Sequence, residues 1–141
     1  MSRKILLGVT GSIAAYKAAE LVRLFIRAGD EVTVVMTPAA CEFVKPLTFQ
    51  TLSRNPVYVD QFAPPVSWKP EHVSLAESAD LVVVAPAMNT GMWENPVTQE
   101  NISALRARGV VVVEPGDGEL ACGVKGKGRM MDPEKIFEQC A

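Results

Sequence analysis

The chain has 141 residues, a length typical of one domain that can bury a core without metals or disulfides. Hydrophobic residues make up 48% and charged residues 21%, which argues against disorder, and the net charge of −2 gives no support to nucleic-acid binding. No apolar stretch is long enough to predict a membrane span. Cys41, Cys122 and Cys140 show no disulfide spacing, so we expect free thiols in a reducing cytoplasm.

The N-terminal part of the chain predicts a strand, a helix and a second strand. Lys4–Val9 is a short apolar run typical of a buried strand. From Ile13 to Ala28, apolar side chains recur every three or four residues, which predicts a helix, and Gly29 stands where helices often end. Glu31–Met36 is rich in β-branched residues and predicts a strand. Together these segments predict a βαβ unit with parallel strands.

The rest of the chain continues this alternation. We expect short helices over 38–53, broken at Pro46, a short strand at 57–59 and a helix at 72–78. The apolar run 80–85 predicts a central parallel strand. Asn95 and Pro96 indicate the start of a helix that runs to about Ala107. A strand at 109–114, a glycine-rich loop over 115–129 and a last helix from Asp132 complete the prediction.

The alternation of strands and helices indicates an α/β fold. We predict one domain over residues 1–141, with a three-layer, Rossmann-like architecture of the flavodoxin type. In this fold an open parallel sheet has helices on both faces, and ligands bind beyond the carboxyl ends of the strands.

The loop after the first strand is a candidate phosphate site. Gly11 permits close approach of the backbone, and Ser12 offers a hydroxyl and a helix cap. The following helix N-terminus favours negative charge. The glycine spacing matches neither the dinucleotide fingerprint nor the triphosphate loop, so a single phosphate fits better. An ordinary strand-to-helix turn remains the alternative.

Three further places could carry chemistry. His72, the only histidine, is a candidate for proton transfer or a plain surface or capping residue, and no second histidine or clustered cysteine supports a metal site. Cys122 is either a chemically active thiol or an incidental one. Asn89 has three apolar neighbours in the sequence, Met88, Met92 and Trp93. This grouping is typical either of a pocket with one polar amide or of an ordinary core.

Taken together, several motifs resemble those of the homo-oligomeric flavin-containing cysteine decarboxylases, in the branch that serves coenzyme A biosynthesis. The motifs, in chain order, are Gly11-Ser12-Ile13-Ala14-Ala15-Tyr16-Lys17, His72, Pro86-Ala87-Met88-Asn89 with Met92-Trp93, Ala121-Cys122-Gly123 and Gly128-Arg129-Met130. The resemblance covers essentially the whole chain. It implies an FMN enzyme that converts 4′-phosphopantothenoylcysteine to 4′-phosphopantetheine by removing its carboxyl group.

The resemblance also implies a role for individual residues. His72 would be the active-site base, Asn89 would bind the substrate carboxylate, and Cys122 would donate a proton in the reductive half of the reaction. The expected FMN contacts are Gly11, Ser12, Ile13, Thr37, Pro86 and Ala87. The expected substrate contacts are Asn89, Met92, Ala121, Cys122 and Lys125. For Lys125, Lys127 and Arg129 a solvated basic loop is the alternative to a phosphate site.

The chain departs from the family pattern at one point. The family has a first Pro-Ala motif, then a helix and a strand, and only then Pro-Ala-Met-Asn. Here Pro86-Ala87 runs directly into Met88-Asn89, as though the two motifs had been joined. A helix and a strand, about 30 residues for such a unit, are therefore expected to be missing, together with part of the flavin site.

The resemblance leaves more than one function open. It implies a homo-oligomer, either a trimer or an assembly of trimers, with flavin sites at subunit contacts. A peptidyl-cysteine decarboxylase of the same family is an alternative, although Cys122 argues against it. A flavin-binding regulatory or partner subunit without turnover is another, because the missing segment removes part of the site.

Overall fold

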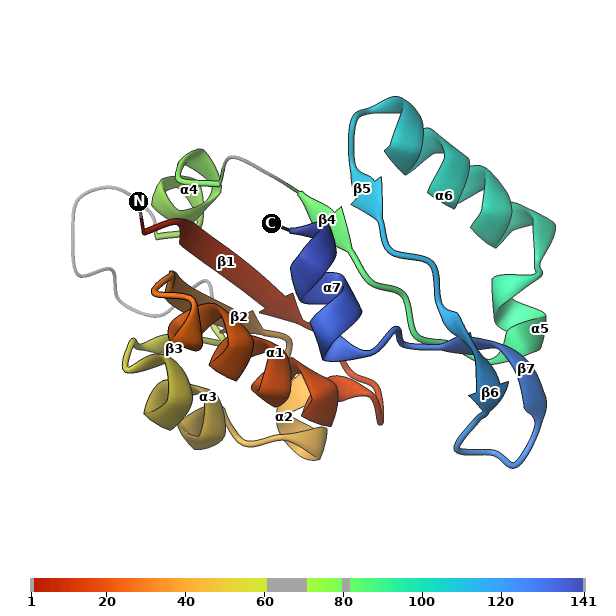
Figure 1. The fold of residues 1–141 in the computed structure, drawn as a ribbon, viewed down its shortest axis with the longest axis horizontal. Helices are drawn as coiled ribbons and strands as arrows, with labels where there is room; N and C mark the ends of the chain where they lie inside the picture. Colours follow the sequence, from red (N-terminus) through yellow and green to blue (C-terminus); the bar gives the residue numbers. More distant parts are fainter. Residues whose placement is uncertain (1, 61–70, 80–81, 141) are drawn as a thin grey trace. The chain divides into compact units, whose positions relative to one another are not determined.

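The computed structural model of the chain describes residues 2–60, 71–79 and 82–140, with only the backbone at Glu71 and His72. The elements in chain order are β1 (Lys4–Val9), α1 (Ala15–Arg27), β2 (Glu31–Met36), α2 (Ala40–Phe43), α3 (Pro46–Ser53), β3 (Val57–Tyr58), α4 (Glu71–Glu77), β4 (Val83–Val84), α5 (Thr90–Trp93), α6 (Pro96–Ala107), β5 (Val111–Val112), β6 (Gly116–Glu119), β7 (Lys125–Arg129) and α7 (Pro133–Gln139) (Figure 1). They fall into two compact units, residues 1–80 and 81–141.

The first unit is built on a parallel sheet with strand order β1-β2-β3. β1 and β2 pair along their whole length, from Lys4 opposite Glu31 to Val9 opposite Met36. Alternate residues of β2 are buried, which is the pattern of a strand with one face against a core. α1 and α3 pack on this sheet and on each other, and Phe25 and Phe49 are fully buried there.

The start of this unit is fixed by an ion pair. Arg3 donates from Nη2 to Oδ2 of Asp30 at 2.6 Å and from Nε to Oδ1 at 3.1 Å. The Asp30 side chain is only 4% exposed. The Arg3 hydrogen bond is the main reason that the pKa of Asp30 lies below its ordinary value, against the opposing effect of burial. This contact joins the residue before β1 to the turn that precedes β2.

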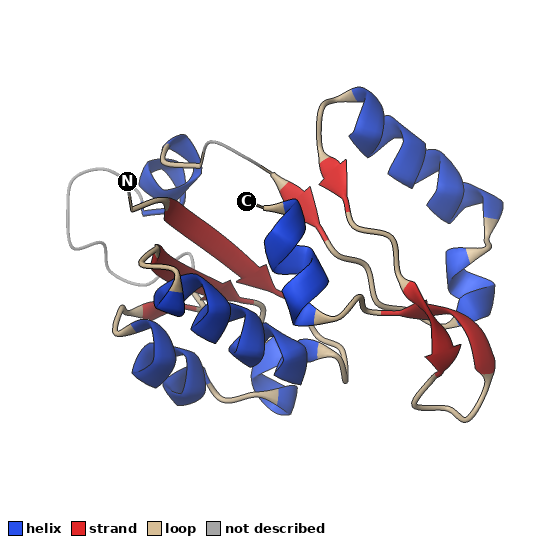
Figure 2. Ribbon diagram, in the orientation of Figure 1, coloured by secondary structure: helices blue, strands red, loops and turns tan. Residues whose placement is uncertain are grey.

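The second unit contains a short parallel pair and an antiparallel hairpin. Val83 and Val84 of β4 pair with Val111 and Val112 of β5. β6 and β7 form the hairpin, with a register shift after Gly116. Figure 2 shows the two hairpin strands as neighbouring arrows. α5 packs on β7 and on α6, and α6 packs on β5.

Most of the elements expected from the sequence are present. The parallel pairs and the intervening helices confirm the α/β class and the N-terminal βαβ unit. The break between α2 and α3 lies just before Pro46, and Asn95 caps α6 by accepting a hydrogen bond from the backbone N–H of Val97. The prediction of one domain over 1–141 stays a prediction.

Two local predictions were wrong. Residues 115–129 contain the β6–β7 hairpin instead of an open loop, because backbone pairing across Gly118 and Gly126 is compatible with glycine in an antiparallel ladder. Ser12 is not the cap of α1, since the cap position is Ala14 and the helix begins at Ala15. α5 was not predicted at all, because four residues carry too little periodicity.

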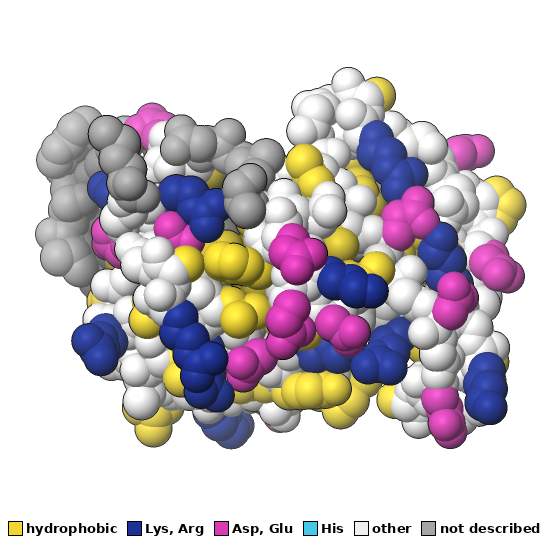
Figure 3. Space-filling view, in the orientation of Figure 1, with side chains coloured by type: hydrophobic (Ala, Val, Ile, Leu, Met, Phe, Trp, Pro, Cys, Tyr) yellow, Lys and Arg dark blue, Asp and Glu magenta, His cyan; other side chains and the backbone are white. Residues whose placement is uncertain are grey.

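Surface charge agrees with the small net charge of the sequence. On the face drawn in Figure 3, Lys and Arg side chains lie among Asp and Glu side chains. No helix among the described residues is long and apolar enough to cross a membrane. All three cysteines are described, and none forms a disulfide.

Candidate functional site

The best-defined candidate site lies in the second unit, where residues 88–90 meet β7. The backbone N–H of Met88 donates to the carbonyl of Gly128 at 2.9 Å. A Cβ at Gly128 would lie 2.1 Å from the Met88 carbonyl oxygen, and one at Gly126 would lie 2.5 Å from the Thr90 hydroxyl. The two glycines therefore allow the hairpin to lie directly against the segment that carries Asn89.

Asn89 is held by a cap and faces the hairpin turn. Its Oδ1 accepts from the backbone N–H of Gly91 at 2.8 Å, which caps α5. Its Nδ2 lies 3.6 Å from Sγ of Cys122, within the range of a hydrogen bond to sulfur. Because Oδ1 is fixed by the cap, the NH₂ group is directed away from it, toward the thiol. Both residues are exposed to solvent.

Cys122 occupies the turn that joins β6 to β7. Gly123 has φ of +80° and donates to the carbonyl of Leu120 at 2.8 Å, while Leu120 donates to the carbonyl of Val124 at 2.9 Å. Only glycine adopts such a φ without strain, which explains Gly123 directly after the cysteine. The thiol therefore projects from a closed hairpin turn and not from the open glycine-rich loop expected from the sequence.

Other predicted residues of this unit lie within three positions of Asn89 or Cys122 in the sequence. Met92 belongs to α5 and is 60% exposed, and Ala121 is exposed in the hairpin turn. Lys125, at the first position of β7, is exposed and pairs with Glu119 in the strand register. Pro86 is buried and Ala87 is half-buried between β4 and Met88. The exposed Met92 thioether and the exposed Asn89 amide offer one apolar and one polar group within the same short segment.

The predicted phosphate loop lies in the first unit, at the carboxyl ends of β1 and β2. The Ser12 hydroxyl accepts from the backbone N–H of Ala14 at 3.2 Å and so stabilises the turn before α1. A Cβ at Gly11 would lie 2.7 Å from that of Ala39. Gly11 is therefore required by the packing of two loops, a structural reason that the sequence did not reveal. Ile13 is 59% exposed.

Thr37 joins these two loops. Its backbone N–H donates to the carbonyl of Val9 at 3.0 Å, and its hydroxyl accepts from the backbone N–H of Ala40 at 3.2 Å. Thr37 and Gly11 are both exposed. The structure thus brings Gly11, Ser12, Ile13 and Thr37 to one edge of the first sheet, as predicted from the parallel βαβ unit.

The remaining predicted residues are placed differently. The helix that contains His72 is present, but the His72 side chain lies outside the described residues. No three His, Cys, Asp or Glu side chains cluster as a metal site within the described part of the chain. Lys127 is not simply solvated, because it forms an ion pair with Glu114. The Lys-Gly-Lys-Gly-Arg alternation of β7 was the overlooked signal of a strand with one glycine face.

Comparison with known proteins places this geometry in a family. The profile of the family described as Flavoprotein matches residues 1–87 and again residues 82–141. The chain belongs to the flavoprotein family. The chain is 38% identical to the coenzyme A biosynthesis bifunctional protein CoaBC of Haemophilus influenzae, over 96% of this chain and 42% of that protein. The chain therefore spans about two fifths of the length of the bifunctional relatives. It is 37% identical to the probable phosphopantothenoylcysteine decarboxylase of Streptococcus mutans, over 99% of this chain and 97% of that one.

Solved structures of this family share the fold. A cysteine-to-serine mutant of PPC decarboxylase, complexed with pantothenoylaminoethenethiol, superposes with a TM-score of 0.85 and 25% identity, covering 99% of this chain and 97% of that one. The FMN binding protein AtHal3 gives a TM-score of 0.81 and 25% identity, covering 99% of this chain and 95% of that one. These flavoprotein neighbours confirm the Rossmann-like, flavodoxin-type class.

The comparisons also show that this chain is shorter than the relatives it matches. The alignment to the Streptococcus mutans flavoprotein extends over 174 positions, although this chain has 141 residues. The two profile matches share residues 82–87, the segment that ends in Ala85-Pro86-Ala87. Residues 82–87 therefore belong to both matches with the family profile. This agrees with the expected loss of a segment at the Ala87–Met88 join.

Proposed function

We propose that this chain binds FMN and decarboxylates 4′-phosphopantothenoylcysteine to 4′-phosphopantetheine, a step of coenzyme A biosynthesis. The observation that carries the proposal is the 3.6 Å contact between Nδ2 of Asn89 and Sγ of Cys122. An amide that can bind a carboxylate and a thiol that can give a proton lie side by side, in a member of the flavoprotein family. The names of the relatives support the same substrate and reaction.

The loops of the first unit fit the phosphate end of FMN. The exposed residues Gly11 and Thr37 and the Ser12 hydroxyl lie where the carboxyl ends of two parallel strands meet, which is where such sheets bind ligands. Ile13, which is exposed beside this loop, would cover an apolar part of the cofactor. When bound, FMN supplies a two-electron oxidation of the substrate and later returns the electrons.

Asn89 and Cys122 have complementary tasks in this proposal. The Asn89 amide donates to the substrate carboxylate and orients it. After carbon dioxide has left, the Cys122 S–H group gives its proton to the carbon of the enethiolate, and solvent returns a proton to the thiolate. Met92, Ala121 and Lys125 line the approach of the substrate. His72 acts as the base that accepts the substrate's proton.

The proposal extends to assembly and location. We infer a homotrimer, or a homododecamer built from trimers, in which flavin sites lie at subunit contacts. The cytoplasm is the expected compartment, because the proposed donor Cys122 must stay reduced. Neither nucleic acid nor a membrane is a proposed partner.

A direct test combines spectroscopy with product analysis. The purified chain should show bound flavin absorbance near about 450 nm, a property of the cofactor itself. Addition of 4′-phosphopantothenoylcysteine should release carbon dioxide and form 4′-phosphopantetheine. Flavin binding without carbon dioxide release would favour a non-catalytic flavin-binding subunit. A chain that binds no added FMN would contradict the proposal.

A further inference from the structure

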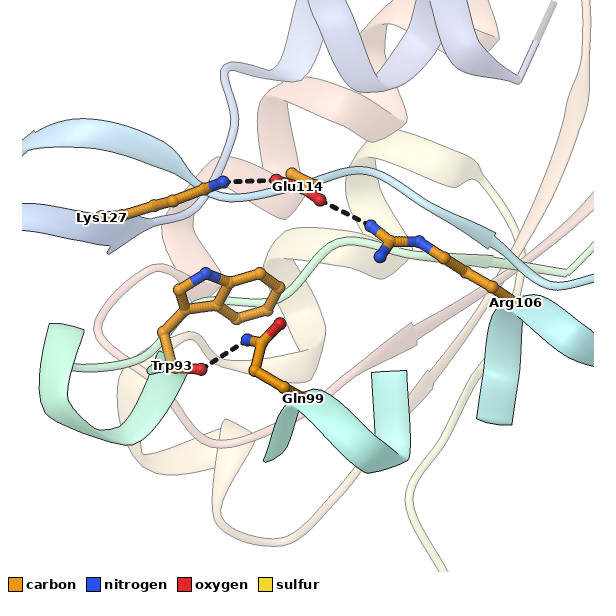
Figure 4. Close-up of polar contacts among 5 residues, drawn as sticks. All are labelled: Trp93, Gln99, Arg106, Glu114 and Lys127. Atoms are coloured by element: carbon orange, nitrogen blue, oxygen red, sulfur yellow. Dashed lines mark hydrogen bonds and ion pairs between the residues drawn. The ribbon is translucent and has the colours of Figure 1, made fainter. Parts of the chain in front are cut away.

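A charged cluster lies at the base of the hairpin that carries Cys122. Glu114, two residues after β5, accepts from Nη2 of Arg106 at 2.7 Å with Oε1 and forms an ion pair with Lys127 through Oε2 (Figure 4). Arg106 belongs to the last turn of α6, and Lys127 lies in the middle of β7. One carboxylate thus connects a helix to the second strand of the hairpin.

Lys127 makes a second contact that extends the cluster to α5. Its ammonium lies 5.9 Å from the centroid of the Trp93 ring, within the range of a cation–π contact. Trp93 is 4% exposed, and its carbonyl accepts from Nε2 of Gln99 at 2.5 Å. Figure 4 shows the indole between the Gln99 amide and the lysine. The lysine therefore lies over the ring of a residue whose backbone carbonyl is bonded to α6.

Residues on both faces of β7 contact the segment 88–93, which includes α5. The glycine face, Gly126 and Gly128, lies against residues 88–90. Lys127, between the two glycines, points to the other face and meets Glu114. α5 begins directly after Asn89 and ends at Trp93. The contact of the glycine face with residues 88–90 and the contact of Lys127 with Trp93 therefore both involve the helix that Asn89 caps.

We propose that Glu114 is a positioning residue, which fixes the β6–β7 hairpin so that Cys122 stays beside Asn89. The proposal rests on the proposed function for its catalytic meaning, since Glu114 contacts Arg106 and Lys127 and acts on Cys122 only through the hairpin. Without the carboxylate, Lys127 keeps only its contact with the Trp93 ring, and the face of β7 opposite the glycines is held less firmly. The turn with Cys122 then samples positions farther from Asn89.

The charge state of Glu114 supports this role. The hydrogen bonds from Lys127, and secondly from Arg106, lower the pKa of Glu114 below its ordinary value. The carboxylate is therefore ionised at neutral pH, and both contacts are charge-assisted.

The first test measures proximity without using the reaction. In a background with Asn89→Cys, Cys41→Ser and Cys140→Ser, oxidised glutathione can oxidise the thiols at positions 89 and 122 to a disulfide, while the glutathione disulfide is reduced to two thiols. Adding Glu114→Gln should slow this cross-link about threefold to fivefold, the population change that a partly exposed ion pair can cause. Lys127→Met, which breaks the same pair from the other side, should slow it similarly.

A matched control is available in the same hairpin. Glu119 is an exposed glutamate of β6, and Glu119→Gln removes the same charge there. Its cross-linking rate should equal that of the background protein, and Glu114→Asp should recover part of the rate. Equal rates for Glu114→Gln and Glu119→Gln would overturn the proposal, whether or not the protein has any activity.

The second test addresses the catalytic consequence in the protein with all native cysteines and Asn89. Glu114→Gln should release carbon dioxide at nearly the parent rate but form about threefold less 4′-phosphopantetheine per carbon dioxide. If Glu114→Gln slowed the cross-link but left the ratio of 4′-phosphopantetheine to carbon dioxide unchanged, the placement of Cys122 by Glu114 would have no role in catalysis. A parent protein without turnover would instead contradict the proposed function, and the cross-link would still decide the placement of Cys122.

Discussion

Asp30 is a buried acidic side chain, and Arg3 is the residue that makes its burial possible. Two side-chain hydrogen bonds and one from the Arg3 backbone converge on the carboxylate. A buried charge is costly unless it is paired, so the pair holds β1 in register with the start of β2 more firmly than an exposed pair would. At the scale of single residues, stability and chemistry both depend on such specific partners.

Loss of Arg3 is expected to destabilise the chain in a pH-dependent way. Arg3→Ala should lower the free energy of unfolding by about 1.5–3 kcal/mol at pH 7, because the Asp30 carboxylate loses a charged donor. The pKa of Asp30 is depressed in the folded state, so its contribution is present above the ordinary value of 3.8 and disappears as the pH falls through the lower folded value. Urea unfolding at pH 7 and pH 3 should show a smaller effect at pH 3.

Arg23 supplies the control for this prediction. It forms an exposed pair with Glu20 within α1, at 3.3 Å. Arg23→Ala should therefore change the free energy of unfolding by less than about 0.5 kcal/mol at either pH. A loss of the same size for Arg3→Ala and Arg23→Ala would show that burial of Asp30 adds nothing.

Cys122 is the residue whose proposed chemistry is easiest to isolate. Cys122→Ser should retain carbon dioxide release but accumulate the oxidised decarboxylated product, because a hydroxyl is a much weaker proton donor than a thiol. Mass spectrometry of the products measures the ratio. Cys41→Ser, which changes a thiol hydrogen-bonded to the Thr37 carbonyl, should leave the ratio unchanged. An unchanged 4′-phosphopantetheine yield in Cys122→Ser would refute the donor role.

At the scale of elements, the β6–β7 hairpin depends on glycine for contact and not for flexibility. Its second strand places two glycines against residues 88–90, and any side chain there would meet backbone or the Thr90 side chain. The same approach leaves the Thr90 hydroxyl buried, without a hydrogen-bond partner in the part of the chain that the structure describes. The close contact therefore costs one hydrogen bond at a buried hydroxyl, and the packing of the hairpin must offset this loss of free energy.

Gly128 is the position at which this dependence can be measured. Gly128→Ala should lower the free energy of unfolding by about 1–3 kcal/mol, because the new Cβ would force the Met88 carbonyl away. Gly116→Ala is the matched change in the same hairpin, where a Cβ would lie 4.0 Å from the nearest atom outside its chain neighbours. It should cost less than about 0.5 kcal/mol. Similar unfolding midpoints for the two variants in urea would contradict the packing argument.

At the scale of the whole molecule, the chain is a family member with a shortened interior. Alignments to full-length relatives extend beyond its 141 residues, and residues 82–87 match the family profile twice. In the first unit, β1 is the outer strand of the order β1-β2-β3 among the described residues. An outer strand leaves one row of backbone N–H and C=O groups without sheet partners.

Restoring the segment should therefore improve both stability and flavin retention. Insertion of the corresponding residues of the Streptococcus mutans relative between Ala87 and Met88 adds about one helix and one strand. We expect the free energy of unfolding to rise by more than about 2 kcal/mol, through burial of apolar surface. FMN retained after gel filtration should rise as well. A glycine-serine insertion of equal length is the control, and equal results for the two insertions would contradict this expectation.

The sequence by itself determined the N-terminal βαβ unit, the capped α6 and the family. These depend on apolar periodicity, β-branched residues, capping residues and short motifs, which act over a few neighbouring positions. The tertiary structure alone decided why Gly11, Gly126 and Gly128 are glycines, that residues 115–129 contain a hairpin, and that Glu114 binds Lys127. The three glycines depend on contacts with segments distant in the chain, which local patterns do not encode. The hairpin and its ion pair are closer in sequence, but the alternation of Lys125 to Arg129 is too short a signal to decide them.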